Sequence, residues 1–311
     1  MIKYLILIRW QNTLIIIMTM ILIMYFLIVP LLGLEGEKAG LSLLEFCLLT
    51  AGSAFIAIGG NILNDISDTN ADSINKAGKN MVGRGISVYT SWNLYYLFTI
   101  TGIFAGSALS FLTGRINYSL IYFFSAGLLW FYSRKYQCQV LVGNIVVSLL
   151  SALSFGLVWL FQFIALSRDA DMFTSAQASF PLVNNMVLIY MGFAFFTSLM
   201  REIVKDIEDI KGDDRFGCRT FPVVYGARKA KLLLNAVGTL TLTGLLLAQY
   251  YFYRLQLNLH FWYFFAIDLL LIFVIVRTAA SREKKDHSKT SSTIKIIMLL
   301  GIISMLFFKF Y

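Results

Sequence analysis

Long apolar segments separated by short polar stretches run the whole length of the chain. A helix needs roughly 20 apolar residues to cross a bilayer, and nine segments come close to this length. Their approximate bounds are 13–34, 41–63, 91–112, 116–133, 140–166, 181–200, 230–252, 261–279 and 294–310. The pattern predicts an all-α integral membrane protein of about nine transmembrane helices. We expect the first segment to be retained, because it is too long for a secretory signal and no small-residue cleavage site follows it.

The composition agrees with a chain that is surrounded by lipid. Of the 311 residues, 58% are hydrophobic and only 14% are charged, whereas a soluble domain carries about 25% charged residues. No polar stretch looks like a separate soluble domain or a linker. We therefore expect residues 1–311 to form a single membrane-embedded domain.

The basic residues are divided unevenly between the two sides of the membrane. The N-terminus and the loops near 64–90, 134–139, 201–229 and 280–293 carry 21 of the 26 lysines and arginines, and the opposite side carries 5. Basic loops stay in the cytoplasm, so the first side is predicted to face it, with the chain in an inner or cytoplasmic membrane. The net charge of +9 is then a topology signal, and we expect no nucleic-acid partner.

Two acidic clusters follow apolar segments on the predicted cytoplasmic side. The first, after the second segment, contains Asn61, Asn64, Asp65, Asp68 and Asp72, and the second, after the sixth, contains Glu202, Asp206, Asp209 and Asp213. In each cluster the spacing places the acidic side chains on one face of a helix. Because the clusters are four segments apart, we predict two pseudo-repeated four-helix units plus a ninth helix.

Carboxylates stacked in this way repel one another and need a cation. Two such charges about 5 Å apart cost about 3 kcal/mol at an effective dielectric constant of about 20. Mg²⁺ suits such a cluster, since it binds through a few carboxylates plus substrate phosphates. We therefore expect a diphosphate to be held through Mg²⁺ between the two clusters. The predicted metal ligands are Asn64, Asp65, Asp68, Asp72, Asp206, Asp209 and Asp213, and the six aspartates are also the predicted catalytic residues.

Two other interpretations of the clusters remain open from the residues alone. One is a solvated acidic helix end without a ligand. The other is the cation site of a transporter, although transporters usually place such sites near mid-bilayer on broken helices, and these segments are unbroken. The three cysteines, Cys47, Cys138 and Cys218, have a spacing that indicates neither a disulfide framework nor a zinc site.

Basic and amide side chains close to the clusters are candidates for binding a diphosphate, because a departing diphosphate needs charge compensation. Lys79 and Arg84 follow the first cluster and Lys205 lies within the second. Arg134 and Lys135 end the fourth segment, and Arg9 with Asn12 precedes the first. The positive-inside bias explains many of the other basic residues.

The clusters resemble the signature of a known enzyme family. Asn64-Asp65-x-x-Asp68-x-x-x-Asp72 is similar to the NDxxDxxxD motif of UbiA-type intramembrane prenyltransferases, and Asp206-x-x-Asp209-x-x-x-Asp213 is similar to their DxxDxxxD motif. The resemblance covers the whole chain. The stretch 201–222 and the pair Gly143-Asn144 look most like the branch that includes digeranylgeranylglyceryl phosphate synthases. The chain departs from the family after the fourth segment, where Tyr132, Arg134 and Lys135 stand at shifted positions, and at Lys79-Asn80, where the family has Arg-Pro.

The resemblance implies Mg²⁺-dependent transfer of a prenyl group from a prenyl diphosphate donor, such as geranylgeranyl diphosphate, to a lipophilic acceptor within the bilayer. The implied acceptor is geranylgeranylglyceryl phosphate, and the alternative is an aromatic quinone or haem precursor. Aromatic side chains such as Trp130, Phe131 and Tyr132 are candidates to stabilise the allyl cation with their ring faces, although membrane packing and interface belts explain most of the aromatic content. The residues expected to bind substrate are Arg9, Asn12, Asn61, Asn64, Lys79, Arg84, Tyr132, Arg134, Lys135, Asn144 and Lys205.

Overall fold

The computed structural model describes residues 2–34, 40–69, 81–281 and 283–310, and within these residues almost all regular structure is helical. The longer helices are α2 (Trp10–Leu22), α4 (Leu43–Ser67), α6 (Val88–Leu112), α7 (Ser119–Arg134), α8 (Val142–Leu166), α10 (Phe180–Arg215), α12 (Ala227–Arg254), α13 (Asn258–Ala280) and α14 (Lys284–Ile303). Helix α2 continues through a π-helical turn, Ile23–Ile28, into α3 (Val29–Leu32). Short helices α1 (Ile2–Leu7), α9 (Ala170–Ala176) and α11 (Phe221–Tyr225) complete the order.

These helices confirm the predicted membrane architecture. Eight helical segments in the described part of the chain are long and apolar enough to cross a membrane. The one predicted segment that is not among these eight, 116–133, corresponds to α7, which has 16 residues. Each of the nine apolar segments thus has a helix of its own, and the protein is an integral membrane protein.

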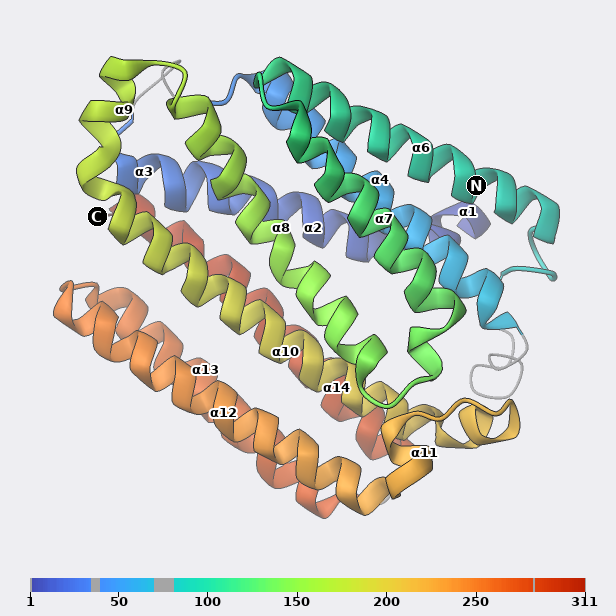
Figure 1. Ribbon diagram of the computed structural model, residues 1–311. Helices are drawn as coiled ribbons and strands as arrows, with labels where there is room; N and C mark the ends of the chain where they lie inside the picture. Colours follow the sequence, from blue (N-terminus) through green and yellow to red (C-terminus); the bar gives the residue numbers. More distant parts are fainter. Residues whose placement is uncertain (1, 35–39, 70–80, 282, 311) are drawn as a thin grey trace.

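The outer surface of the bundle is apolar, as a lipid-facing surface must be. Large hydrophobic side chains such as Phe104, Phe111 and Leu247 are about two-thirds or more exposed. Helices α4 and α6, α8 and α10, and α12 and α13 pack closely in pairs, and α14 packs against α10 (Figure 1). Glycines allow the closest approach: a methyl group at Gly106 of α6 would overlap the Tyr122 ring of α7.

Both acidic clusters lie at the same end of the bundle. In Figure 1 the C-terminal ends of α4 and α10 lie at one end, and α9 lies at the other. At that other end, Arg168 forms a bidentate ion pair with Glu45, with nitrogen–oxygen distances of 2.6 and 3.1 Å. Such forked pairs fix geometry as well as charge, so this contact joins the start of α4 to the end of α8.

Candidate active site

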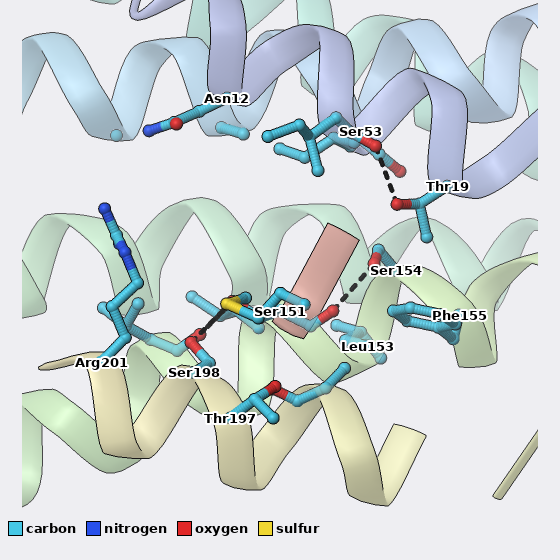
Figure 2. A pocket seen from close by; sticks show the side chains of 18 of the residues that line it. Asn12, Thr19, Ser53, Ser151, Leu153, Ser154, Phe155, Thr197, Ser198 and Arg201 are labelled. Carbon is cyan, nitrogen blue, oxygen red and sulfur yellow. Dashed lines mark hydrogen bonds between the residues drawn. The ribbon is translucent and has the colours of Figure 1, made fainter. Parts of the chain in front are cut away.

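A cavity of about 320 Å³ lies inside the bundle, between helices α2, α4, α7, α8, α10 and α14. Its two ends differ in character (Figure 2). Asn12 and Arg201 lie towards one end in that view, and Phe155 lies towards the other. Tyr190 and Phe193 also line the cavity from α10. A polar mouth and an aromatic interior suit a ligand with a charged head and a long apolar tail.

The first aspartate motif is held at the end of α4 by three polar contacts. The Asn64 side-chain amide donates to Asp68 at 2.5 Å, which confirms that these two residues share a face. Gln137, in the connection between α7 and α8, donates to the other Asp68 oxygen at 2.7 Å. Helix α4 ends at Ser67 with Asp68 as its C-cap, and Asp72 lies outside the described residues.

Arg9 supplies the third contact, an ion pair with Asp65 at 2.5 Å. Its backbone is left-handed, with φ 48°, in the break between α1 and α2. Such a conformation is uncommon for a residue other than glycine, and here it accompanies a guanidinium that lines the cavity. Burial would lower the pKa of Arg9, but the Asp65 carboxylate more than offsets this effect, and the net direction is upward.

The second aspartate motif lies on a single unbroken helix. Helix α10 runs for 36 residues to Arg215, so Asp206, Asp209 and Asp213 continue directly from its membrane-embedded part. Asn144, near the start of α8, donates to Asp206 at 2.9 Å. Hydrogen bonds of this kind orient the carboxylates that serve as metal ligands.

Tyr132 of α7 connects the two motifs. It lines the cavity, and it lies within electrostatic range of Asp68 from the first motif and of Glu202 and Asp206 from the second. Asn64 of the first motif lines the same cavity as Glu202 and Lys205, which lie on the helix just before Asp206.

Glu202 and its basic neighbours form the inner edge of this mouth. Glu202 accepts from Lys205 at 2.5 Å and lies 3.5 Å from the Arg201 guanidinium. All three residues line the cavity, together with Asn12, Asn61 and Asn64. The predicted residues Lys205, Asn12 and Asn61 thus lie where a substrate headgroup would be bound.

Several other predicted residues do not line this cavity. Arg84 is exposed in the turn before α6, and Lys135 is exposed at the end of α7. The Arg134 guanidinium instead stacks over Trp92, 5.0 Å from the ring centroid. Lys79 lies outside the described residues.

The expectation for two aromatic residues was wrong. Trp130 and Phe131 are 41% and 48% exposed, and neither lines the cavity. Helical geometry explains the correction, because successive residues of a helix with about 3.6 residues per turn point in different directions, so the three rings cannot all face inward. Tyr132 is the one of the three that lines the cavity, and Tyr122 lines it from the same helix.

A disulfide that the spacing did not indicate joins two loops beside the site. Cys138 and Cys218 are 80 residues apart in the chain and have Cα atoms 4.4 Å apart. The backbone amide of Arg219 also donates to the Cys138 carbonyl at 3.0 Å. Together these contacts hold the α7–α8 connection against the segment that follows the second motif.

The donors at the mouth fit Mg²⁺. Carboxylate and amide oxygens are the hard ligands that this ion prefers. Among the described residues, no three carboxylate, histidine or cysteine side chains form a ready-made cage. Mg²⁺ usually binds through one or two carboxylates plus substrate phosphates, so the aspartates of the two motifs suit an ion that is shared with a diphosphate.

This combination of two aspartate motifs and an apolar interior matches a known family. The sequence model of the UbiA prenyltransferase family matches residues 31–301. The chain belongs to the UbiA prenyltransferase family. Among its relatives, the digeranylgeranylglyceryl phosphate synthase of Methanococcus aeolicus is 26% identical over 275 residues, 88% of each chain. That of Sulfolobus acidocaldarius is 30% identical over 227 residues, 72% of each chain.

Solved structures share the fold of this UbiA-family chain. A digeranylgeranylglyceryl phosphate synthase structure aligns with a TM-score of 0.63 at 23% identity, covering 98% of this chain and 96% of that one. A UbiA homologue from Archaeoglobus fulgidus, bound to DMAPP and Mg²⁺, aligns with a TM-score of 0.58 at 16% identity, covering 98% and 99%. Membership of a prenyltransferase family supports the enzyme interpretation over the transporter.

Sequence reasoning missed some side chains of this UbiA site. Gln137 has no motif of its own, and nothing in the sequence places it beside Asp68. Arg201 was noticed only as part of the second motif, and Lys295 was not considered, although both line the cavity. A lysine within an apolar segment is itself a signal of function, and that signal was available for Lys295.

Proposed function

We propose that this UbiA-family protein transfers a geranylgeranyl group from its diphosphate to the hydroxyl of a prenylated glycerol phosphate, with Mg²⁺, at the cytoplasmic face of the membrane. The observation that carries the proposal is an apolar cavity that is lined at its polar end by Asn64 of the first motif and by Glu202 and Lys205 beside the second. The synthase names of the relatives support the choice of acceptor. The excess of lysine and arginine in the loops on the side of the aspartate motifs supports an active site that faces the cytoplasm.

The reaction breaks the bond between the allylic carbon and the diphosphate oxygen and forms one between that carbon and the acceptor oxygen. The diphosphate leaves, and the acceptor hydroxyl loses its proton. When bound, Mg²⁺ supplies positive charge to the departing diphosphate. Asn64, Asp68, Asp206 and Asp209 would hold the ion, while Gln137 and Asn144 keep two of these carboxylates oriented.

The rest of the cavity binds the prenyl chain. Tyr122, Phe155, Tyr190 and Phe193 line the interior. Their rings exclude water from the allyl cation, and ring faces attract positive charge. Tyr132 also lines the cavity, within electrostatic range of Asp68 and Asp206.

A competition assay tests the choice of acceptor. The purified protein receives labelled geranylgeranyl diphosphate and Mg²⁺ with equal amounts of geranylgeranylglyceryl phosphate, 4-hydroxybenzoate and dihydroxynaphthoate. We expect the labelled product to be the digeranylgeranyl glycerol phosphate. Efficient labelling of an aromatic acid, with none of the glycerol phosphate, would refute this acceptor and leave the family assignment intact.

A further inference from the structure

Four basic side chains and one acidic side chain line the cavity: Arg9, Arg201, Lys205, Lys295 and Glu202. Two of the bases already have a carboxylate partner. Arg9 pairs with Asp65, and Lys205 pairs with Glu202 at 2.5 Å. Arg201 has only a 3.5 Å contact with the same Glu202 oxygen. Lys295 makes no ion pair with any residue that the structure describes.

The depth of Lys295 follows from two contacts between α10 and α14, which run in opposite directions. The Tyr190 hydroxyl lies 2.6 Å from the Ser304 hydroxyl, and a methyl group at Gly301 would overlap the Phe193 ring. Moving three residues along α10, from Tyr190 to Phe193, thus matches moving three residues back along the chain, from Ser304 to Gly301. Six further residues towards the motif end lead from Gly301 to Lys295 and from Phe193 to position 199. Lys295 therefore lies at the depth of position 199, between Ser198 and Arg201.

This level differs from that of the aspartate motif. Asp206 lies seven residues beyond 199, which is about 10 Å along a helix that rises about 1.5 Å per residue. Hydroxyl groups also gather here: Ser151 of α8 lies 3.3 Å from Ser198, and both line the cavity (Figure 2). Lys295, Ser151 and Ser198 therefore line the cavity on the interior side of Asp206, next to Arg201 at the inner edge of the mouth.

Such a set has the chemistry of an anion site. Each cation is costly within a membrane protein and implies a partner, and a phosphate dianion matches two positive charges. The donor diphosphate is already assigned to the aspartates. A glycerol phosphate acceptor brings a second phosphate, and its hydroxyl must meet the allylic carbon on the interior side of the diphosphate.

We propose that Lys295 and Arg201, with the hydroxyls of Ser151 and Ser198, bind the phosphate of the acceptor and so select a phosphorylated glycerol lipid. This proposal rests on the proposed function. The site is separate from the one that binds the donor, so the acceptor and donor affinities respond to different residues.

The test uses the full-length protein in nanodiscs with the Lys295→Met variant. The KM for geranylgeranylglyceryl phosphate is expected to rise about 10- to 100-fold, since charged hydrogen bonds contribute about 1.5–3 kcal/mol, while the KM for geranylgeranyl diphosphate stays unchanged. The preference of the enzyme for geranylgeranylglyceryl phosphate over geranylgeranylglycerol, which lacks the phosphate, is expected to fall by the same factor. Lys295→Arg keeps the charge and should keep the preference.

Lys289→Met is the matched control, because Lys289 is exposed on the same helix, and its kinetics are expected to equal those of the wild type. An unchanged acceptor KM in Lys295→Met, or an equal loss of donor affinity, would overturn the proposal. If the wild type prenylates only aromatic acids, the proposed acceptor fails instead, and the two failures are distinguishable.

Discussion

Individual side chains at the mouth are oriented by neighbours that are distant in sequence. Gln137 and Asn144 each donate to one motif aspartate, at 2.7 and 2.9 Å. Losing such an orienting partner typically costs a metal site about 10- to 100-fold in affinity or activity. Removal of the aspartate itself is expected to cost more.

Asp68→Asn and Asp209→Asn are therefore expected to lower the rate of prenyl transfer by about 100-fold or more, because each replaces a charged ligand with a neutral one. The protein should remain folded, as measured by thermal unfolding in detergent. Asp214→Asn is the matched control, since Asp214 is exposed and stands outside the DxxDxxxD spacing. Full activity in both motif variants would refute the assigned metal role.

At the scale of helices, the length of the apolar segments was sufficient to predict the spans, because a helix that crosses a bilayer needs roughly 20 apolar residues. The i, i+4 spacing also predicted that Asn64 and Asp68 share a face, and their hydrogen bond confirms it. The sequence did not reveal which face of α7 points inward, so Trp130 was misplaced. Nor did it reveal the register of α14 against α10, which decides the depth of Lys295.

Helices α4 and α10 end on the same side of the bundle, and we predict that this side faces the cytoplasm. In a Cys47→Ser background, a cysteine placed at Ser175 in α9 is expected to react with a membrane-impermeant thiol reagent added outside intact cells. A cysteine at Ser87, at the motif end, should stay unmodified until the cells are opened. Both positions are exposed on the protein. Labelling of both from outside would contradict a cytoplasmic active site.

The molecule as a whole combines a lipid-facing apolar surface with a polar mouth at one end of an apolar cavity. This arrangement lets a membrane-dissolved prenyl chain and a charged diphosphate occupy one site, since the chain enters the interior and the charge stays at the mouth. Under the proposed function, Mg²⁺ held between the two motifs balances the charge of the diphosphate.

The most direct test is the Mg²⁺ dependence of transfer by the purified protein in nanodiscs, with labelled geranylgeranyl diphosphate and geranylgeranylglyceryl phosphate. Product and free diphosphate are measured in the same samples. Product and free diphosphate are expected to appear in equal amounts and to rise with Mg²⁺. Both should vanish when EDTA is added and return when Mg²⁺ is restored. Transfer that continues at full rate in EDTA, or diphosphate release without any product, would contradict the proposed role of Mg²⁺.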